Sequence, residues 1–387
     1  MKKRLILTLM LSTLALTSCS RDGGGGDNGG GTNPPVVNES YDYKFSRDGF
    51  STVDFKEGEA LINLFYKLDN GLKSASRFSK NYYQEKGVYG KSLDDITATS
   101  IGYYLKNTTL KTEVKQDIDH YFEDLVLIAN ANQEAKKGIA GWIGYDEERR
   151  YVNGYGEETG QVLQKALMGV ALLDRINNHH LSSEILNDAK LQKDNSNIVL
   201  VSGKKYTELE HHWDMAFAYL GKENSLYKPL FIANYLEKET KDMLFLRGVD
   251  ERVYKAYYKG RKAVVSQNYD EMKNQAEIIN KELGTLFAAR AIYYLKKALP
   301  DMKEDARNAF HGLSEAQGFI YALNSIRKAD GTPYLSHAEV QQLLTDLRGA
   351  GGFWDVDRLA ASKNTKGSLL NISERIANKF GFKSEDI

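Results

Sequence analysis

The sequence of 387 residues contains a single cysteine, Cys19, near its N-terminus. The rest of the chain therefore has no internal disulfide, no cysteine nucleophile and no thiolate metal site. Proline is also scarce, with five in all, and two of these are adjacent at residues 34 and 35. We expect the other three, Pro229, Pro300 and Pro333, to lie at helix boundaries, because proline disrupts the hydrogen bonds of a helix interior.

Neither sign of charge dominates, since 52 Lys and Arg residues balance 52 Asp and Glu residues. This balance argues against nucleic acid as a partner, which would require a basic surface. The sequence also lacks the HExxH helix of zinc proteases and the GxSxG turn of serine hydrolases. These absences favour a binding protein over an enzyme.

The N-terminus reads as an export signal. A basic start, KKR at residues 2–4, precedes a short apolar run, and this order is typical of a signal peptide rather than a transmembrane helix. The LTSC sequence at residues 16–19 resembles the lipobox of bacterial lipoproteins, which implies cleavage before Cys19 and its acylation. Ser20 is not the aspartate that favours inner-membrane retention, so we expect an outer-membrane lipoprotein on either the periplasmic or the cell-surface face.

The predicted domain organisation has four parts. Residues 1–18 form the signal peptide and residues 19–40 form a glycine-rich tether. Residues 41–200 and 201–387 are expected to form two packed helical bundles. The polar stretch Gln192–Lys205 is the predicted connection between the bundles.

Amphipathic patterns indicate an all-α fold with little or no β structure. Apolar residues recur at helical spacing over residues 110–129, 162–173 and 269–298. No series of alternating hairpins is present.

The stretch Leu209–Gly221, LEHHWDMAFAYLG, combines such a stripe with potential ligands. His211 and Asp214 lie one helical turn apart, and Glu208 lies one turn before both His211 and His212. A histidine that binds metal needs an acceptor for its other nitrogen, and Glu208 is placed to serve either histidine. Trp213 is expected to pack behind them. His212 lies closer to the apolar stripe, so His211 is the histidine that we expect to be available.

A second pair, His311 and Glu315, also shares a helix face. If the two pairs meet across the bundles, they form a nitrogen and oxygen site suited to iron or zinc. The alternative is a hydrogen-bonded pair without metal. The doublet His179-His180 follows a helical stretch, where cationic side chains favour the carbonyl terminus, and this position indicates capping.

Three segments together resemble a known family: GEETGQVLQKALMG at residues 156–169, LEHHWDMAFAYLG at residues 209–221 and FHGLSEAQGFIYAL at residues 310–323. They resemble an uncharacterised family of bacterial surface lipoproteins with a domain of unknown function, which is distantly similar to imelysin-like proteins. That resemblance implies two helical bundles, a link to iron or haem uptake, and a histidine and an acid one turn apart as metal ligands.

The expected function is therefore ligand binding for iron, haem or metal acquisition by a monomeric lipoprotein that delivers to an outer-membrane transporter. The expected metal ligands are His211, Asp214, His311 and Glu315. A glycan- or peptide-binding surface lipoprotein with structural histidines is the alternative. A metallopeptidase, as the imelysin resemblance implies, is a third interpretation.

Overall fold

A computed structural model describes residues 42–75, 112–145, 148–224, 226–241, 243–328 and 330–387. The predicted signal peptide, Cys19 and the tether lie outside the described residues. Residues Tyr41 to Ile387 belong to one compact unit. The division into two bundles near residue 200 stays a prediction.

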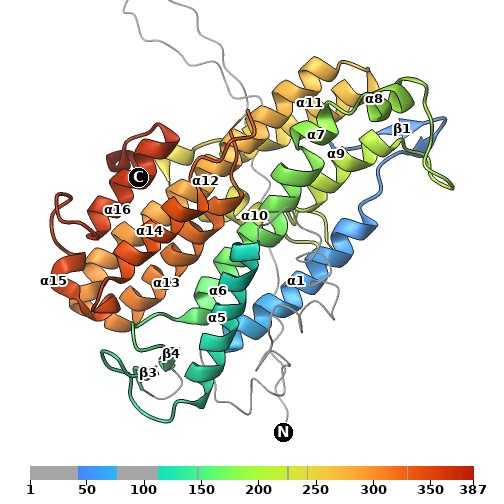
Figure 1. Cartoon of the computed structure of the whole chain (residues 1–387). Coiled ribbons are helices and arrows are strands. Elements are labelled where there is room, and N and C mark those ends of the chain that lie inside the picture. The colour runs from blue at the N-terminus through green and yellow to red at the C-terminus, as the bar shows by residue number, and fades with distance from the viewer. Residues whose placement is uncertain (1–41, 76–111, 146–147, 225, 242, 329) are drawn as a thin grey trace, which may run out of the picture. The chain divides into compact units, whose positions relative to one another are not determined.

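Helices account for most of the described residues, and the all-α prediction is confirmed (Figure 1). The α-helices are α1 (Lys56–Ala75), α5 (Thr112–Asn130), α6 (Thr159–Leu167), α7 (Ser183–Leu186), α8 (Ala189–Ser196), α9 (Glu208–Ala218), α10 (Phe231–Asn234), α11 (Val249–Val265), α12 (Tyr269–Glu304), α13 (Ala306–Ala322), α14 (His337–Arg348), α15 (Val356–Leu359) and α16 (Leu369–Phe380). The π-helical segments are η2 (Met168–Leu173), η3 (Arg175–His180) and η4 (Tyr235–Glu239). The 3-10 segments are η5 (Leu244–Leu246), η6 (Leu323–Ser325), η7 (Gly352–Trp354) and η8 (Ser384–Asp386).

Two small antiparallel sheets complete the described part of the fold. Strand β1 (Ser46–Arg47) pairs with β2 (Phe50–Ser51), and β3 (Gly141–Ile143) pairs with β4 (Arg150–Val152).

The longest element, α12, organises the packing. Its 36 residues extend over about 54 Å, and it contacts α11, α13 and α16. Helix α13 packs in turn against α6, which also contacts α1 and α5. Figure 1 shows α1 and α12 on opposite sides of α6. The contact between α6 and α13 therefore joins the N-terminal and C-terminal helices.

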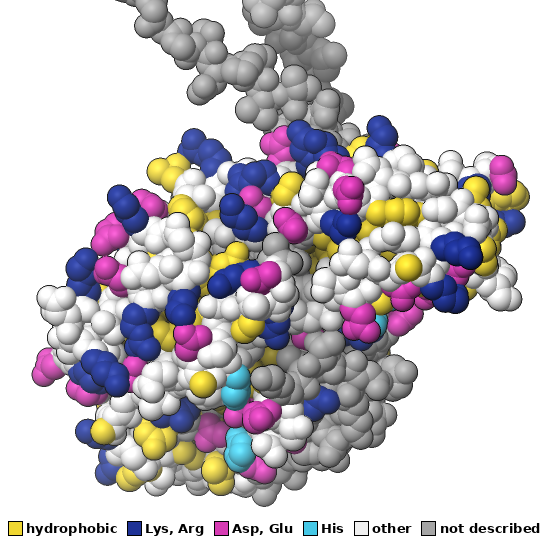
Figure 2. Space-filling model, turned by 45° about the horizontal axis from the view of Figure 1, so that its top comes forward, with side chains coloured by type: hydrophobic (Ala, Val, Ile, Leu, Met, Phe, Trp, Pro, Cys, Tyr) yellow, Lys and Arg dark blue, Asp and Glu magenta, His cyan; other side chains and the backbone are white. Residues whose placement is uncertain are grey.

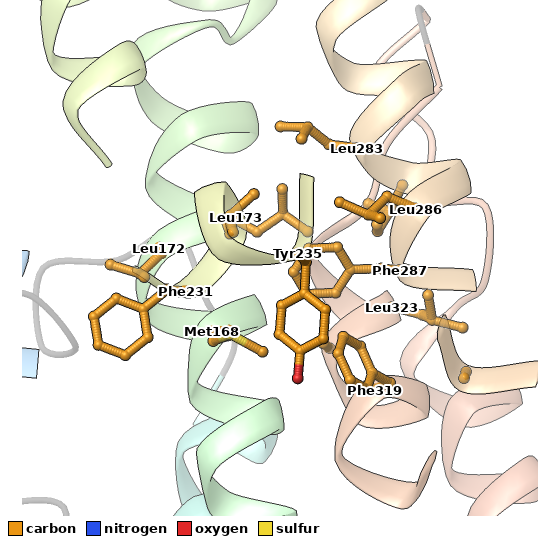
Figure 3. Packing of buried hydrophobic residues seen from close by; sticks show 14 of the residues in the cluster. Met168, Leu172, Leu173, Phe231, Tyr235, Leu283, Leu286, Phe287, Phe319 and Leu323 are labelled. Carbon is orange, nitrogen blue, oxygen red and sulfur yellow. The ribbon is translucent and has the colours of Figure 1, made fainter. Parts of the chain in front are cut away.

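Aromatic and aliphatic side chains fill the space between these helices (Figure 3). Phe319 of α13 lies edge-on to Tyr235 of η4, with ring centroids 5.1 Å apart, and 5.5 Å from the ring of Phe287 of α12. Met168 of η2 is buried beside them. Burial of this apolar surface is the main force that holds the helices together.

The boundary prediction was wrong at one of the three prolines. Helix α12 continues through Pro300 to Glu304. Beyond the proline, Met302 packs against the hydrophobic core, and this contact holds the last turn although Pro300 provides no backbone N–H. Pro229 lies shortly before α10 and Pro333 shortly before α14, as predicted.

Basic and acidic side chains are interspersed over the face shown in Figure 2. This distribution agrees with the equal numbers of the two charges in the sequence. Among the described residues, the structure has no helix that is both long and apolar enough to cross a membrane.

Candidate metal centre

Helix α9 carries five of the residues singled out in the sequence. A capping box fixes its start, because Thr207 Oγ1 accepts from the Glu210 N–H while the Glu210 carboxylate accepts from the Thr207 N–H. Trp213 is buried against α11, and its Nε1–H donates to the Tyr257 carbonyl at 2.9 Å. The tryptophan is therefore part of the core.

Asp214 is fully buried and already engaged. Its Oδ1 accepts from Arg261 Nε and from the Tyr43 hydroxyl, both at 2.8 Å. Burial raises the pKa of the Asp214 carboxyl to about 6, against the opposing effect of the Arg261 guanidinium. The carboxylate serves as the counter-ion of a buried arginine.

His211 and Glu208 lie at the edge of α9. The His211 ring stacks on Tyr206, with centroids 4.6 Å apart. Glu208 is exposed, and its carboxylate lies 4.0 Å from His212 Nε2. Glu208 therefore approaches His212 across one helical turn.

His311 and Glu315 share one face of α13, as their spacing predicts, and each already has a polar partner nearby. His311 Nδ1 lies 2.8 Å from Glu158 Oε2 and 2.9 Å from Arg150 Nη1. That nitrogen can donate to the carboxylate or accept from the arginine, depending on the tautomer. Glu315 pairs with Lys165 at 3.1 Å, and its second oxygen is 3.8 Å from His311 Nε2.

The structure brings a different set of ligands together. A candidate metal site is a group of three or more His, Cys, Asp or Glu side chains whose potential metal-binding atoms lie within 4.8 Å of one another. Among the described residues, His179, His180 and His212 form such a group. The four residues of the predicted joint site, His211, Asp214, His311 and Glu315, do not form such a group.

We call His179, His180 and His212 the histidine cluster. The ring centroid of His179 lies 4.6 Å from that of His180 and 5.6 Å from that of His212. His180 Nδ1 lies 3.0 Å from His212 Nδ1. That distance is a hydrogen bond between the two neutral rings, one nitrogen donating and the other accepting. Two imidazole nitrogens bound to one tetrahedral ion at 2.0–2.1 Å would be about 3.3 Å apart, so a shared ion would need only a small movement of the rings.

Backbone geometry explains how two consecutive histidines reach one place. They end the π-helical segment η3, where the Leu181 N–H donates to the Ile176 carbonyl five residues back. A π turn holds more residues than an α turn, so neighbouring side chains diverge less, and such turns occur frequently at functional sites. Helix α9 packs against η3 and brings His212 to the pair.

The histidine cluster is kept in its uncharged form. Burial lowers the pKa of His179 to about 4, and the Arg175 charge adds to this effect. Burial and the neighbouring histidines lower the pKa of His212 to about 4 and that of His180 well below its usual value. At neutral pH all three imidazoles are therefore neutral, which is the form that binds metal.

One further contact favours a ligand role for His212. The Nε2 atom of His180, which is 6% exposed, has no hydrogen-bond partner among the described residues, but it is Nδ1 of that ring that faces His212. The outer nitrogen of His212 faces the Glu208 carboxylate at 4.0 Å. A carboxylate behind a histidine is the arrangement that orients metal ligands in proteins.

Sequence reasoning assigned His179 and His180 to helix capping and His212 to the core, so it missed this cluster. The available signal was the presence of two histidine doublets in one chain, at residues 179–180 and 211–212. Their meeting depends on the π-helical end of η3, which periodicity does not reveal.

Comparison with known proteins identifies a family, but the description of that family names no activity. A family model described as "Domain of unknown function (DUF4856)" matches residues 40–383. No curated protein matches the chain, and no solved structure does.

Proposed function

The chain belongs to this family of unknown function, and on that premise we propose that it is a lipid-anchored protein that binds a transition-metal ion for uptake. The histidine cluster carries the proposal. Imidazole nitrogens suit zinc, copper, nickel and iron(II) better than the hard ions magnesium and calcium. Within the expected set of iron, haem and zinc, zinc or iron(II) fits best, because three imidazole nitrogens within reach of one another match a tetrahedral ion, whereas a haem iron takes one or two axial protein ligands.

Three protein ligands leave one position of a tetrahedral ion open. A ligand of the receiving protein can enter that position, which supports transfer of the ion rather than permanent storage. In this proposal the protein is a monomer, distantly related to imelysin-like proteins, and it passes the ion to an outer-membrane transporter.

The lipid anchor belongs to the same proposal. The lipobox-like sequence at residues 16–19 and the glycine-rich tether support attachment to the outer membrane through Cys19. Replacement of Cys19 by serine should move the protein from the membrane fraction to the soluble fraction. Unchanged membrane association would refute the anchor and leave the metal site untouched.

Calorimetric titration of the metal-free full chain in detergent with zinc chloride tests the metal site. We expect one ion per chain, and a loss of affinity of at least about tenfold in His179→Gln and in His212→Gln, because each variant removes one ligand. His120→Gln is the matched control, because His120 is exposed on α5 and outside the cluster. Equal binding by parent and cluster variants would overturn the assignment.

A glycan- or peptide-binding role remains the second candidate. The three tryptophans do not support it, since Trp213 is buried, Trp142 is covered by the Arg149 guanidinium at 4.6 Å and Trp354 packs edge-on against Phe310. The observation that favours this role is a polar cavity between α1, α6 and α12, which is separate from the histidine cluster.

A further inference from the structure

A cavity of about 490 Å³ lies between the N-terminal and central helices. Tyr66 of α1, Phe231 of α10, Tyr235 of η4 and Tyr294 of α12 contribute aromatic side chains to its walls. Cavities of a few hundred cubic ångströms with aromatic walls are typical of small-molecule sites. None of the three clustered histidines lines it.

Gln164 of α6 supplies an unused amide to this cavity. The side chain is 2% exposed, and neither Nε2 nor Oε1 has a hydrogen-bond partner among the described residues. Buried polar groups are almost always hydrogen-bonded, and this amide stays unpartnered whichever way it is turned, because both atoms lack a partner. A ligand that both donates and accepts, as a hydroxyl group does, would satisfy it.

The charges inside the cavity neutralise each other. Lys165 pairs with Glu315 at 3.1 Å, and Lys73 pairs with Asp69 at 2.6 Å. The ammonium of Lys165 also lies 5.8 Å from the Tyr235 ring. The interior is thus polar and close to neutral, so it favours hydrogen bonds over net charge.

The rim of the cavity is positive. Lys228 and Lys238 line it and are exposed, and no carboxylate of the described residues lies within 4.0 Å of either ammonium group. The one further acid that lines the cavity, Glu239, lies 3.8 Å from Arg290. An anionic group on the ligand would therefore be attracted to this rim.

The aromatic walls offer apolar ring edges to a sugar. Tyr235 lies beside Met168, which also lines the cavity (Figure 3). The Arg290 guanidinium lies over the Tyr235 ring at 5.0 Å and over the Tyr294 ring at 4.6 Å, so it covers a face of each ring and holds both rings in place. Such rings offer C–H contacts next to a polar hydroxyl.

We infer that this cavity binds an anionic polyol of monosaccharide size, such as a uronic acid or a sugar phosphate. The hydroxyl groups bind Gln164, the apolar side of the sugar contacts the edges of the tyrosine rings, and the anionic group faces Lys228 and Lys238. The site is independent of the histidine cluster, so either assignment can fail without the other.

A larger cavity of about 660 Å³ near α5 and α14 does not carry the same argument. Its buried polar groups bind each other. Asn153 Nδ2 donates to Asp124 and to Glu157, at 2.8 and 2.7 Å, and Arg348 pairs with Glu157 at 2.7 Å. These groups are satisfied without a ligand.

Calorimetric titration of the full chain in detergent with glucuronate, glucose 6-phosphate, glucose and inorganic phosphate tests the inference. We expect one of the two anionic sugars to bind at least tenfold more tightly than glucose and inorganic phosphate. The preferred anion, carboxylate or phosphate, then identifies the ligand class. Gln164→Leu should weaken this binding at least tenfold, and so should the double variant Lys228→Ala with Lys238→Ala.

Lys281→Ala is the matched control, because Lys281 is an exposed lysine of α12 outside the cavity. Its affinity should equal that of the parent. Far-ultraviolet circular dichroism confirms folding of Gln164→Leu, and the surface double variant tests the site without touching the core. Absence of binding by the folded parent, equal binding of glucose or inorganic phosphate, or undiminished binding by both variants would overturn the inference.

Discussion

At the scale of single residues, the histidine cluster shows how burial decides protonation. An imidazole with a pKa of about 4 is neutral at every physiological pH, whereas an exposed histidine titrates near pH 6.5. Protons therefore compete weakly with metal at this cluster. The same burial makes the metal-free protein sensitive to acid.

The pH dependence of stability follows from these pKa values. His212 has a folded pKa of about 4 against 6.5 in the unfolded chain, so the unfolded chain binds more protons between these values. The free energy of unfolding should therefore fall as the pH falls from 6.5 to 4, by up to about 3 kcal/mol for His212. His212→Gln should reduce that loss.

Urea unfolding of the metal-free protein at pH 4.5 and pH 7 measures this difference. The comparison must be between variant and parent, because the raised pKa of Asp214 has the opposite effect in the same window. His120→Gln should behave as the parent. An equal pH dependence in His212→Gln and the parent would contradict the proposed protonation states.

The sequence correctly pointed to histidines as the candidate metal ligands, but it did not predict which histidines lie together. It identified His211 as the available member of its doublet, whereas the structure stacks His211 on Tyr206 and places His212 in the cluster. His211 and His212 are consecutive residues of α9, so the rotation of α9 about its axis determines which of the two side chains faces His179 and His180. That rotation depends on Trp213 and on packing with α11, which the sequence of α9 alone does not contain.

At the scale of elements, α9 and α11 approach closely at a glycine. A side-chain carbon on Gly260 would overlap the Trp213 ring, so the absence of a side chain lets the indole lie against the α11 backbone. This contact sets the position of α9 and therefore that of His212.

Gly260→Ala should destabilise the protein by about 1–3 kcal/mol, because the extra methyl group forces the indole to move. Gly312→Ala is the matched control, since its added carbon would meet nothing closer than the Tyr294 carbonyl at 3.9 Å. This second variant should stabilise α13 by roughly 0.5–1 kcal/mol. Urea unfolding measures both, and equal effects would contradict the packing argument.

Long amphipathic helices were the most predictable elements. The periodicity over residues 269–298 predicted α12 apart from its last turn, where packing of Met302 overrides Pro300. The polar stretch Gln192–Lys205 was predicted as a connection, yet α8 extends through Ser196. Asp188 caps that helix, accepting from the Lys190 and Leu191 N–H groups, and a local cap outweighs the missing apolar stripe.

At the scale of the whole molecule, a buried charge network connects the segment after the tether to the helices. Arg261 of α11 is fully buried and pairs with Asp214 and Glu210 of α9. Tyr43 donates to Asp214, and Arg47 pairs with Glu210 at 2.9 Å. The segment nearest the proposed membrane anchor is thereby fixed to the helix that carries His212.

Arg261→Met should cost about 3–5 kcal/mol, because it leaves two buried carboxylates without their main counter-charge. Arg252→Met is the matched control on the same helix, where the lost pair with Glu282 is near the surface and should cost less than about 1 kcal/mol. Chemical unfolding at pH 7 distinguishes them. Similar losses for the two arginines would show that burial of the Arg261 network does not make it more important to stability than a surface ion pair.

The central claim is that His179, His180 and His212 bind one metal ion together. X-ray absorption spectroscopy of the chain loaded with one equivalent of zinc tests it most directly. The account predicts about three imidazole nitrogens at roughly 2.0–2.1 Å and a fourth light ligand. A shell dominated by carboxylate oxygens, or a histidine signal that persists unchanged in His212→Gln, would contradict it.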